Sequence, residues 1–131
     1  MSRTMTTAAL LALAALAGCE PEPDLVELVN LSSPPFASTA SIETDRERDV
    51  YVVELSVGVA LAVGCWDSCY PDQVCKLTTA DPEKLGVRPL YHLGSSLEDD
   101  FVLVAQRVGM TSLRVDSACA SQEYVVRVVD R

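Results

Sequence analysis

Apolar and polar residues alternate along most of the chain, most clearly between Asp49 and Cys65. Every second residue from Tyr51 onward in that stretch is apolar, and the residues between them include Glu54. A repeat of two that is rich in β-branched residues is typical of a strand with one buried face. Gly58 falls within the stretch, and we expect it to mark a bulge or bend that divides the segment.

Shorter apolar segments, separated by turn residues, fill the rest of the chain after residue 24. The other expected strands are 25–31, 36–42, 74–79, 85–93, 100–108, 111–118 and 124–130. Residues 43–49 are expected to form a charged, solvated turn or one helical turn, 82–85 a helical turn, and 120–122 the turn of the terminal hairpin. Seven to nine short strands with regularly spaced turns predict an all-β fold, an antiparallel β-sandwich.

The first eighteen residues differ from everything that follows. Ala8 to Ala17 is an unbroken apolar run of ten residues, preceded by Arg3. Ten helical residues rise about 15 Å, which is half the thickness of a hydrocarbon core, so the run is too short to span a bilayer. We expect residues 1–18 to be a signal-peptide helix rather than a buried N-terminal helix, because the run has no polar face.

The end of this run is Leu16-Ala17-Gly18-Cys19, which resembles the lipobox of bacterial lipoproteins. The resemblance implies that Cys19 becomes the acylated first residue of the mature chain, with palmitate-type acyl chains that hold it in a membrane. In that family aspartate after the cysteine favours the inner membrane, so Glu20 favours the outer membrane. Residues 19–24 are expected to form a short acidic, proline-rich tether to a single domain of residues 25–131.

The acidic net charge argues against two classes of partner. Removing residues 1–18 takes away one arginine and no acid, so the net charge changes from −9 to −10. Nucleic-acid binding needs basic surface that neutralises phosphates, and the chain has no basic cluster that would provide it. Docking on anionic lipid headgroups is disfavoured for the same reason.

Four segments in the second half of the chain carry a family pattern: Cys75–Pro82, Leu85–Pro89, Phe101–Val115 and Tyr124–Val129. Together they resemble the bacterial immunoglobulin-like domain of the second group, over residues 50–131. The resemblance implies an immunoglobulin-like sandwich used for adhesion, display or spacing, with no catalytic residues and no cofactor. Gly109 stands where that family makes a tight turn between two strands. Most members of the family lack the cysteines present in this chain.

Four cysteines remain after Cys19, namely Cys65, Cys69, Cys75 and Cys119. Their spacing, C-x3-C-x5-C-x43-C, is neither that of a usual zinc knuckle nor that of a C-x-x-C redox pair. In an oxidising compartment four cysteines indicate two disulfides, and the strand pattern is expected to gather them at one rim. All three pairings give nearly the same loop entropy. Geometry favours Cys65–Cys119 with Cys69–Cys75, or else Cys75–Cys119 with Cys65–Cys69.

Three further groups of residues are candidate sites: His92, residues 98–100, and Trp66 with Tyr70. His92 is the one histidine, and it lies in a strand-like run without a nucleophile motif, so we do not expect catalysis through it. The acidic run at 98–100 lacks the glycine spacing of a calcium loop and fits a solvated turn. Trp66 and Tyr70 are candidates for an exposed contact with a partner, although Trp66 would alternatively cover the disulfides.

These features predict an exported, lipid-anchored, non-enzymatic protein of the cell envelope. It would act as an interaction, adhesion or structural module, with its acyl chains in a membrane and a protein partner at the envelope. The alternative is a periplasm-facing lipoprotein that binds a small molecule or a metal ion. A pocket with converging polar groups would favour the alternative, whereas a shallow surface with an aromatic rim would favour the first function.

Overall fold

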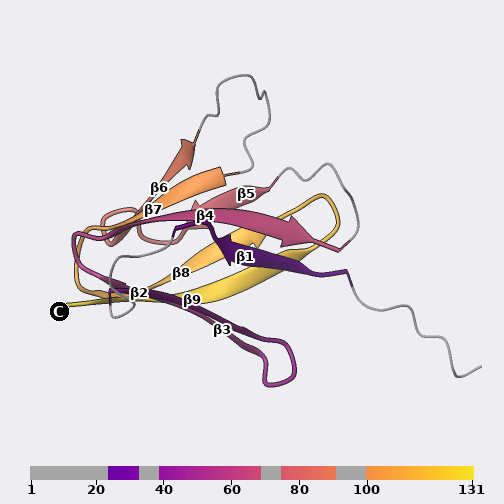
Figure 1. Cartoon of the computed structure of the whole chain (residues 1–131), viewed down its shortest axis with the longest axis horizontal. Helices are drawn as coiled ribbons and strands as arrows, with labels where there is room; N and C mark the ends of the chain where they lie inside the picture. The colour runs from indigo at the N-terminus through magenta and orange to yellow at the C-terminus, as the bar shows by residue number, and fades with distance from the viewer. Residues whose placement is uncertain (1–23, 33–38, 69–74, 91–99) are drawn as a thin grey trace, which may run out of the picture.

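The part of the chain that the structure describes folds into nine strands in two packed sheets (Figure 1). A computed structural model describes residues 24–32, 39–68, 75–90 and 100–131. The strands are β1 (Val26–Asn30), β2 (Ala40–Asp45), β3 (Val50–Ser56), β4 (Ala60–Asp67), β5 (Lys76–Thr79), β6 (Leu85–Leu90), β7 (Asp100–Ala105), β8 (Gly109–Asp116) and β9 (Ser121–Val129). Among the described residues, no helix is long and apolar enough to cross a membrane.

The order of the strands is that of an immunoglobulin-like sandwich. One sheet has four strands in the order β1-β4-β7-β6, and the other has five in the order β2-β3-β9-β8-β5. If β1 and β4 to β9 are taken as strands A to G, the two sheets become ABED and GFC. β3 pairs with β9 in parallel, all other neighbours are antiparallel, and β2 joins the edge through a hairpin with β3. The sandwich expected from the sequence is therefore confirmed.

The alternating stretch 49–65 contains two strands that belong to different sheets. β3 ends at Ser56 and lies in the five-stranded sheet, whereas β4 begins at Ala60 and lies in the four-stranded sheet. Gly58 makes the crossing with a φ of 85°, a conformation that glycine adopts without steric cost. Its N–H donates to the carbonyl of Ala105, and the N–H of Val57 donates to the carbonyl of Val129, so the crossing contacts both sheets. The bend expected at Gly58 is confirmed.

The core lies between the sheets, where the inward residues of both meet. Its fully buried large side chains are Tyr124, Leu55, Leu61, Leu85, Leu103, Leu113, Val53, Val63, Val115, Val126 and Val128. Tyr124 also connects the two sheets through polar contacts. Its hydroxyl accepts a hydrogen bond from the N–H of Leu28 at 3.1 Å and lies 3.0 Å from the hydroxyl of Thr44. The Tyr51 ring packs edge-on against it, with ring centroids 5.5 Å apart.

Several boundaries differ from those expected. Residues 43–45 continue β2, and only 46–49 turn, because Asp45 caps the turn by accepting from the backbone N–H of Arg48 at 3.0 Å. The terminal hairpin turns at 117–120 rather than 120–122, because the Ser117 hydroxyl accepts the N–H of Ala120 there. Residues 82–84 form a turn without helix. The expected signal peptide, nearly all of the tether, and parts of the segments 36–42 and 85–93 lie outside the described residues.

Candidate functional site

One end of the sandwich carries the tryptophan and the three cysteines that the structure describes. β4 ends there, β1, β5 and β9 begin there, and the turns 46–49 and 117–120 close it. We call this end, with Cys65, Cys75, Cys119 and Trp66, the disulfide end. The first described residue, Asp24, lies at this end next to β1, whereas the C terminus lies at the opposite end (Figure 1). Cys19, Cys69 and Tyr70 fall outside the described residues.

Cys65 and Cys75 form a disulfide with their Cα atoms 6.5 Å apart. Both arrangements favoured by the sequence are therefore wrong, because each joins Cys65 and Cys75 to other cysteines. These arrangements were Cys65–Cys119 with Cys69–Cys75, and Cys75–Cys119 with Cys65–Cys69. The physical reason is the path of the chain. β4 lies in the four-stranded sheet and β5 in the five-stranded sheet, so the connection crosses from one sheet to the other at this end. Its first and last cysteines face each other across the sandwich at a distance suited to a disulfide.

Cys119 lies in the tight turn between β8 and β9. The Ser117 hydroxyl accepts hydrogen bonds from the N–H groups of Cys119 at 3.4 Å and of Ala120 at 3.1 Å. The N–H of Ser117 donates to the carbonyl of Ala120 at 2.8 Å and closes the turn. Cys119 is half-buried and is also disulfide-bonded, with a partner outside the described residues. The turn therefore presents this cysteine in a fixed position at the disulfide end.

Trp66 points away from the core. Cys65 packs against the core, and neighbouring residues of a strand point to opposite faces, so Trp66 lies on the outer face of the four-stranded sheet. It is 42% exposed and stands opposite Glu27 of β1. The guanidinium of Arg46 lies over the Trp66 ring, 5.6 Å from its centroid, and pairs with the Glu27 carboxylate. Trp66 therefore forms an exposed aromatic contact and does not cover the Cys65–Cys75 disulfide.

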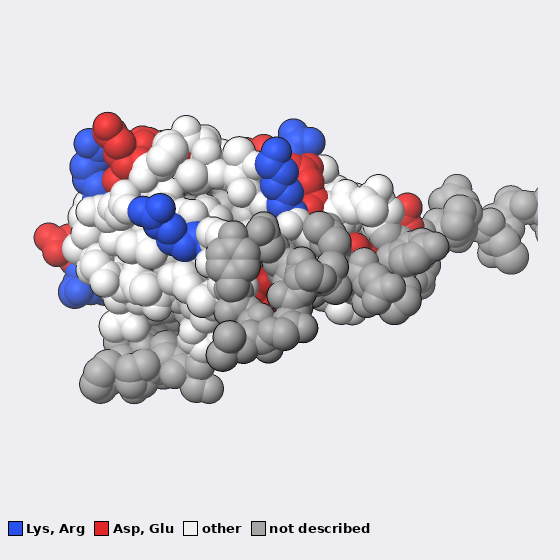
Figure 2. Space-filling view, turned by 90° about the horizontal axis from the view of Figure 1, so that it is seen from above, with Lys and Arg blue, Asp and Glu red and all other residues white. Residues whose placement is uncertain are grey.

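Two aspartates at the disulfide end are held in their ionised form by neighbouring donors. The Ser121 hydroxyl and the Arg114 guanidinium hold the pKa of Asp116 below its ordinary value. The backbone N–H and the side chain of Arg48 do the same for the pKa of Asp45. Both aspartates close turns, so their charge fixes local structure. In the view from above (Figure 2), basic side chains mostly stand beside acidic ones, with uncharged surface between the groups.

Residues suited to metal or nucleophilic chemistry do not converge in the described part of the chain. No group of three or more histidine, cysteine or acidic side chains within it is placed to hold a metal ion. His92, Glu98 and Asp99 lie outside the described residues, and Asp100 is the first residue of β7. The two disulfide-bonded cysteines of known pairing, Cys65 and Cys75, have no free thiolate to act as nucleophile or ligand.

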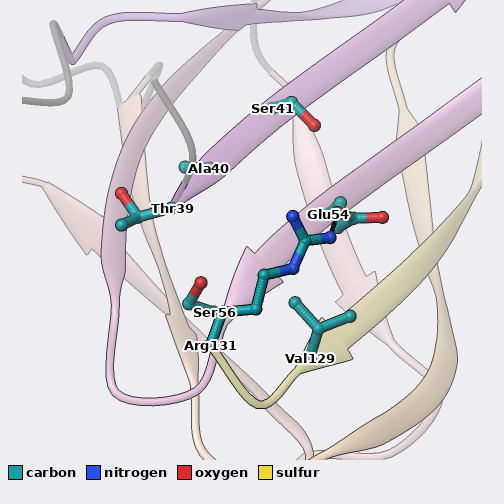
Figure 3. A pocket seen from close by; sticks show the side chains of 7 residues that line it. All are labelled: Thr39, Ala40, Ser41, Glu54, Ser56, Val129 and Arg131. Carbon is teal, nitrogen blue, oxygen red and sulfur yellow. Dashed lines mark hydrogen bonds and ion pairs between the residues drawn. The ribbon is translucent and has the colours of Figure 1, made fainter. Parts of the chain in front are cut away.

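A small cavity of about 80 Å³ lies at the end opposite the disulfides (Figure 3). Ser56 is 3% exposed at its wall, its N–H donates to the carbonyl of Thr39, and its hydroxyl has no partner among the described residues. Arg131 reaches across the opening and pairs with Glu54. A space of this size, lined also by the polar residues Thr39, Ser41, Glu54 and Arg131, suits ordered water. A larger groove of about 460 Å³ runs between β5 and β6 and is open to solvent.

Sequence reasoning missed the residues that surround Trp66. Residues 43–49 were expected to form a solvated loop, yet Arg46 stacks on Trp66, twenty residues along the chain. No sequence pattern links Arg46, Glu27 and Trp66, because the contact depends on how the β2–β3 hairpin lies against β1. The outward direction of Trp66 did have a signal, since it follows an inward-facing cysteine in a strand.

Comparisons with known proteins show similarity of fold only. No family model and no curated protein matches the chain. Among solved structures, the fold is similar to domains 4 and 5 of the S-layer protein SbsC, with a TM-score of 0.45 and 15% identity over 70% of this chain and 51% of that one. It is also similar to a fragment of SbsC, rSbsC(31-844), with a TM-score of 0.44 and 16% identity over 70% of this chain and 13% of the fragment. The chain thus spans about half of the first structure, and likeness at this level carries no inference about function.

Proposed function

We propose that the protein is a lipid-anchored, non-enzymatic module of the cell envelope that mediates interaction, adhesion or structural support. The observation that carries this proposal is the distance in sequence between the lipobox-like Leu16–Cys19 and the first strand. β1 begins at Val26, so only six residues separate Cys19 from the folded domain. A linker of six residues is too short to form a domain of its own, and it would hold the sandwich close to the membrane.

The disulfide-bonded structure is consistent with an exported protein. Disulfides form and persist in oxidising compartments outside the cytosol, and the Cys65–Cys75 link connects the two sheets. A domain of roughly 100 residues buries a modest core, so a covalent link between its layers adds useful stability. Export followed by acylation of Cys19 accounts for both the signal-peptide-like start and the use of the cysteines.

Two or three acyl chains would hold such a domain stably, because each buried methylene contributes about 0.8 kcal/mol. The residue after the acylated cysteine, Glu20, favours the outer membrane. We therefore propose membrane attachment through Cys19 and a protein partner at the envelope.

Metabolic labelling with an alkyne-tagged palmitate tests the proposal. The wild type is expected to incorporate the label and to sediment with membranes. Cys19→Ser should lose both properties, whereas the matched variant Cys119→Ser should keep both, because it removes a cysteine from the folded domain only. Unlabelled wild-type protein in the soluble fraction would contradict the anchor. Chemical cross-linking of the membrane fraction then captures the protein partner, which the soluble Cys19→Ser protein should fail to recover.

A further inference from the structure

The two outer faces of the sandwich differ in polarity. An antiparallel sheet that covers a core normally has a polar outer face. The outer face of the five-stranded sheet follows this rule in its charged residues, such as Glu43, Glu54, Arg114 and Arg127, and also exposes Met110 and Val125. The outer face of the four-stranded sheet does not. Its outward residues on β1, β4 and β7 include Val29, Ala60, Ala62, Gly64, Trp66, Val102 and Val104.

The apolar area is continuous across β1 and β4. Val29 stands opposite Gly64 on one side, and the Leu31 side chain lies over the same glycine, 3.4 Å from where a Cβ would stand; on the β7 side an Asp100 carboxylate oxygen lies 3.2 Å from that point. Trp66 continues the area toward the disulfide end. We call Val29, Leu31, Ala62 and Trp66, with Gly64 between them, the β1–β4 patch. An apolar patch that a folded domain leaves exposed commonly marks a surface of interaction.

Charged residues border the β1–β4 patch and do not lie among its apolar side chains. Glu27 is the acidic residue on the patch side of β1, and it pairs with Arg46, which also covers one face of Trp66. The other charged residues on this outer face are Arg88 of β6 and Asp100 of β7, and Asp100 stands directly opposite Gly64 at the border of the patch. A tryptophan with an arginine beside it is a common combination at a membrane–water interface, where both side chains combine apolar and polar contacts.

The position of the proposed lipid anchor favours the bilayer as the partner of the β1–β4 patch. β1 is the edge strand of the four-stranded sheet, and it begins at the disulfide end beside Trp66. Five peptide steps from Cys19 to Asp24 span at most about 18 Å. An acylated Cys19 would therefore keep the β1 edge within reach of lipid at all times, and this high effective concentration makes a weak contact persistent. The charged outer face of the five-stranded sheet gains nothing from such proximity.

We propose that the β1–β4 patch lies against the lipid bilayer, with the Trp66 ring in the interfacial region. This inference rests on the proposed anchoring through Cys19 and adds an orientation to it. The domain then lies with its four-stranded sheet toward the membrane, and the outer face of the five-stranded sheet is left accessible to envelope partners. The lipid contact is made by apolar and aromatic side chains, so it does not depend on anionic headgroups.

Fluorescence quenching tests the orientation, because Trp66 is the only tryptophan of the chain. Lipidated protein is bound to phosphatidylcholine vesicles with or without bromine atoms on the acyl chains. Emission from Trp66 is expected to fall at least twofold with brominated lipid. In the double variant Trp66→Phe, Met110→Trp, the reporter lies at a 60% exposed position on the five-stranded sheet, and its emission should not change.

Two matched variants control for effects on the fold. Val29→Asp places a charge in the β1–β4 patch, and Val125→Asp places one on the outer face of the five-stranded sheet, at positions that are 41% and 40% exposed. The first is expected to reduce the quenching of Trp66 by more than half, and the second to leave it unchanged. Equal quenching in both variants would overturn the proposal.

The remaining outcomes separate this inference from the anchor itself. Protein that floats with vesicles while Trp66 stays unquenched would overturn the orientation and leave the anchor intact. Unquenched protein that forms dimers cross-linked through the β1–β4 patch would assign the patch to a second copy of the chain and would also overturn the lipid contact. Failure of acylated protein to float would overturn the anchor and the orientation together.

Discussion

At the scale of single residues, Tyr124 connects strands that the hydrogen-bond ladders do not join. Its ring is buried in the core, and its hydroxyl contacts Leu28 of β1 and Thr44 of β2 from a position on β9. The N–H of Leu28 points toward this hydroxyl in a buried position. The Tyr124 hydroxyl, which belongs to the five-stranded sheet, thus accepts a hydrogen bond from a backbone N–H of the four-stranded sheet.

Replacing Tyr124 with phenylalanine should destabilise the protein by about 1 to 3 kcal/mol, because it leaves the buried N–H of Leu28 without an acceptor. Urea unfolding measures the loss. Tyr51→Phe is the matched control, since the Tyr51 hydroxyl makes no hydrogen bond among the described residues, and it should cost much less. Similar losses in the two variants would show that the hydroxyl of Tyr124 contributes nothing specific.

The same residue predicts how stability depends on pH. Burial raises the pKa of Tyr124 above its ordinary value of 10.0, so the folded state holds the phenol proton more tightly than the unfolded state. This contribution to stability is complete below pH 10 and is lost as the pH rises through the folded pKa. The unfolding free energy of the wild type should therefore fall more steeply above pH 10 than that of Tyr124→Phe. Parallel pH profiles would contradict the assignment.

At the scale of elements, the Cys65–Cys75 disulfide joins the end of β4 to the start of β5 and thereby links the two sheets. It closes a loop with a sequence separation of 10 residues. Loop-closure entropy then predicts that the double variant Cys65→Ala, Cys75→Ala is less stable by about 2 to 3 kcal/mol. Urea unfolding under non-reducing conditions is the measurement, and unchanged stability would contradict the role of the link.

Peptide mapping checks the pairing independently of stability. A protease that cuts before aspartate separates the three clustered cysteines, since Asp67 and Asp72 lie between them in sequence. Under non-reducing conditions the fragment with Cys65 should remain joined to the fragment with Cys75. Recovery of Cys65 joined to Cys119 would restore the pairing that the sequence favoured.

At the scale of the whole molecule, the sandwich could be predicted because alternation records which face of each strand is buried. Val53, Leu55, Leu61 and Val63 of the 49–65 stretch are all in the core, and Gly58 divides it as expected. Alternation does not record which sheet a strand joins, so the crossing after β3 was missed. The disulfide pairing was missed because all pairings have similar loop entropy, and the neighbours of Trp66 were missed because tertiary packing brings them together.

The two ends of the sandwich carry different features. Asp24, the disulfides and Trp66 lie at one end, whereas the C terminus and the Ser56 cavity lie at the other. With an anchor at Cys19 and the β1–β4 patch against the bilayer, the first end holds the attachment, and the outer face of the five-stranded sheet points away from the membrane. Partners at the envelope are therefore expected to meet the charged outer face of the five-stranded sheet, and substitutions there should change partner capture without changing membrane attachment.

Attachment through Cys19 is the central claim, and the mass of the N-terminal peptide of protein isolated from its native membrane tests it most directly. We predict a mature chain that begins at Cys19 and carries a diacylglycerol thioether on that cysteine. A peptide that begins at Met1, or one in which Cys19 is unmodified, would contradict the lipid anchor and the orientation derived from it.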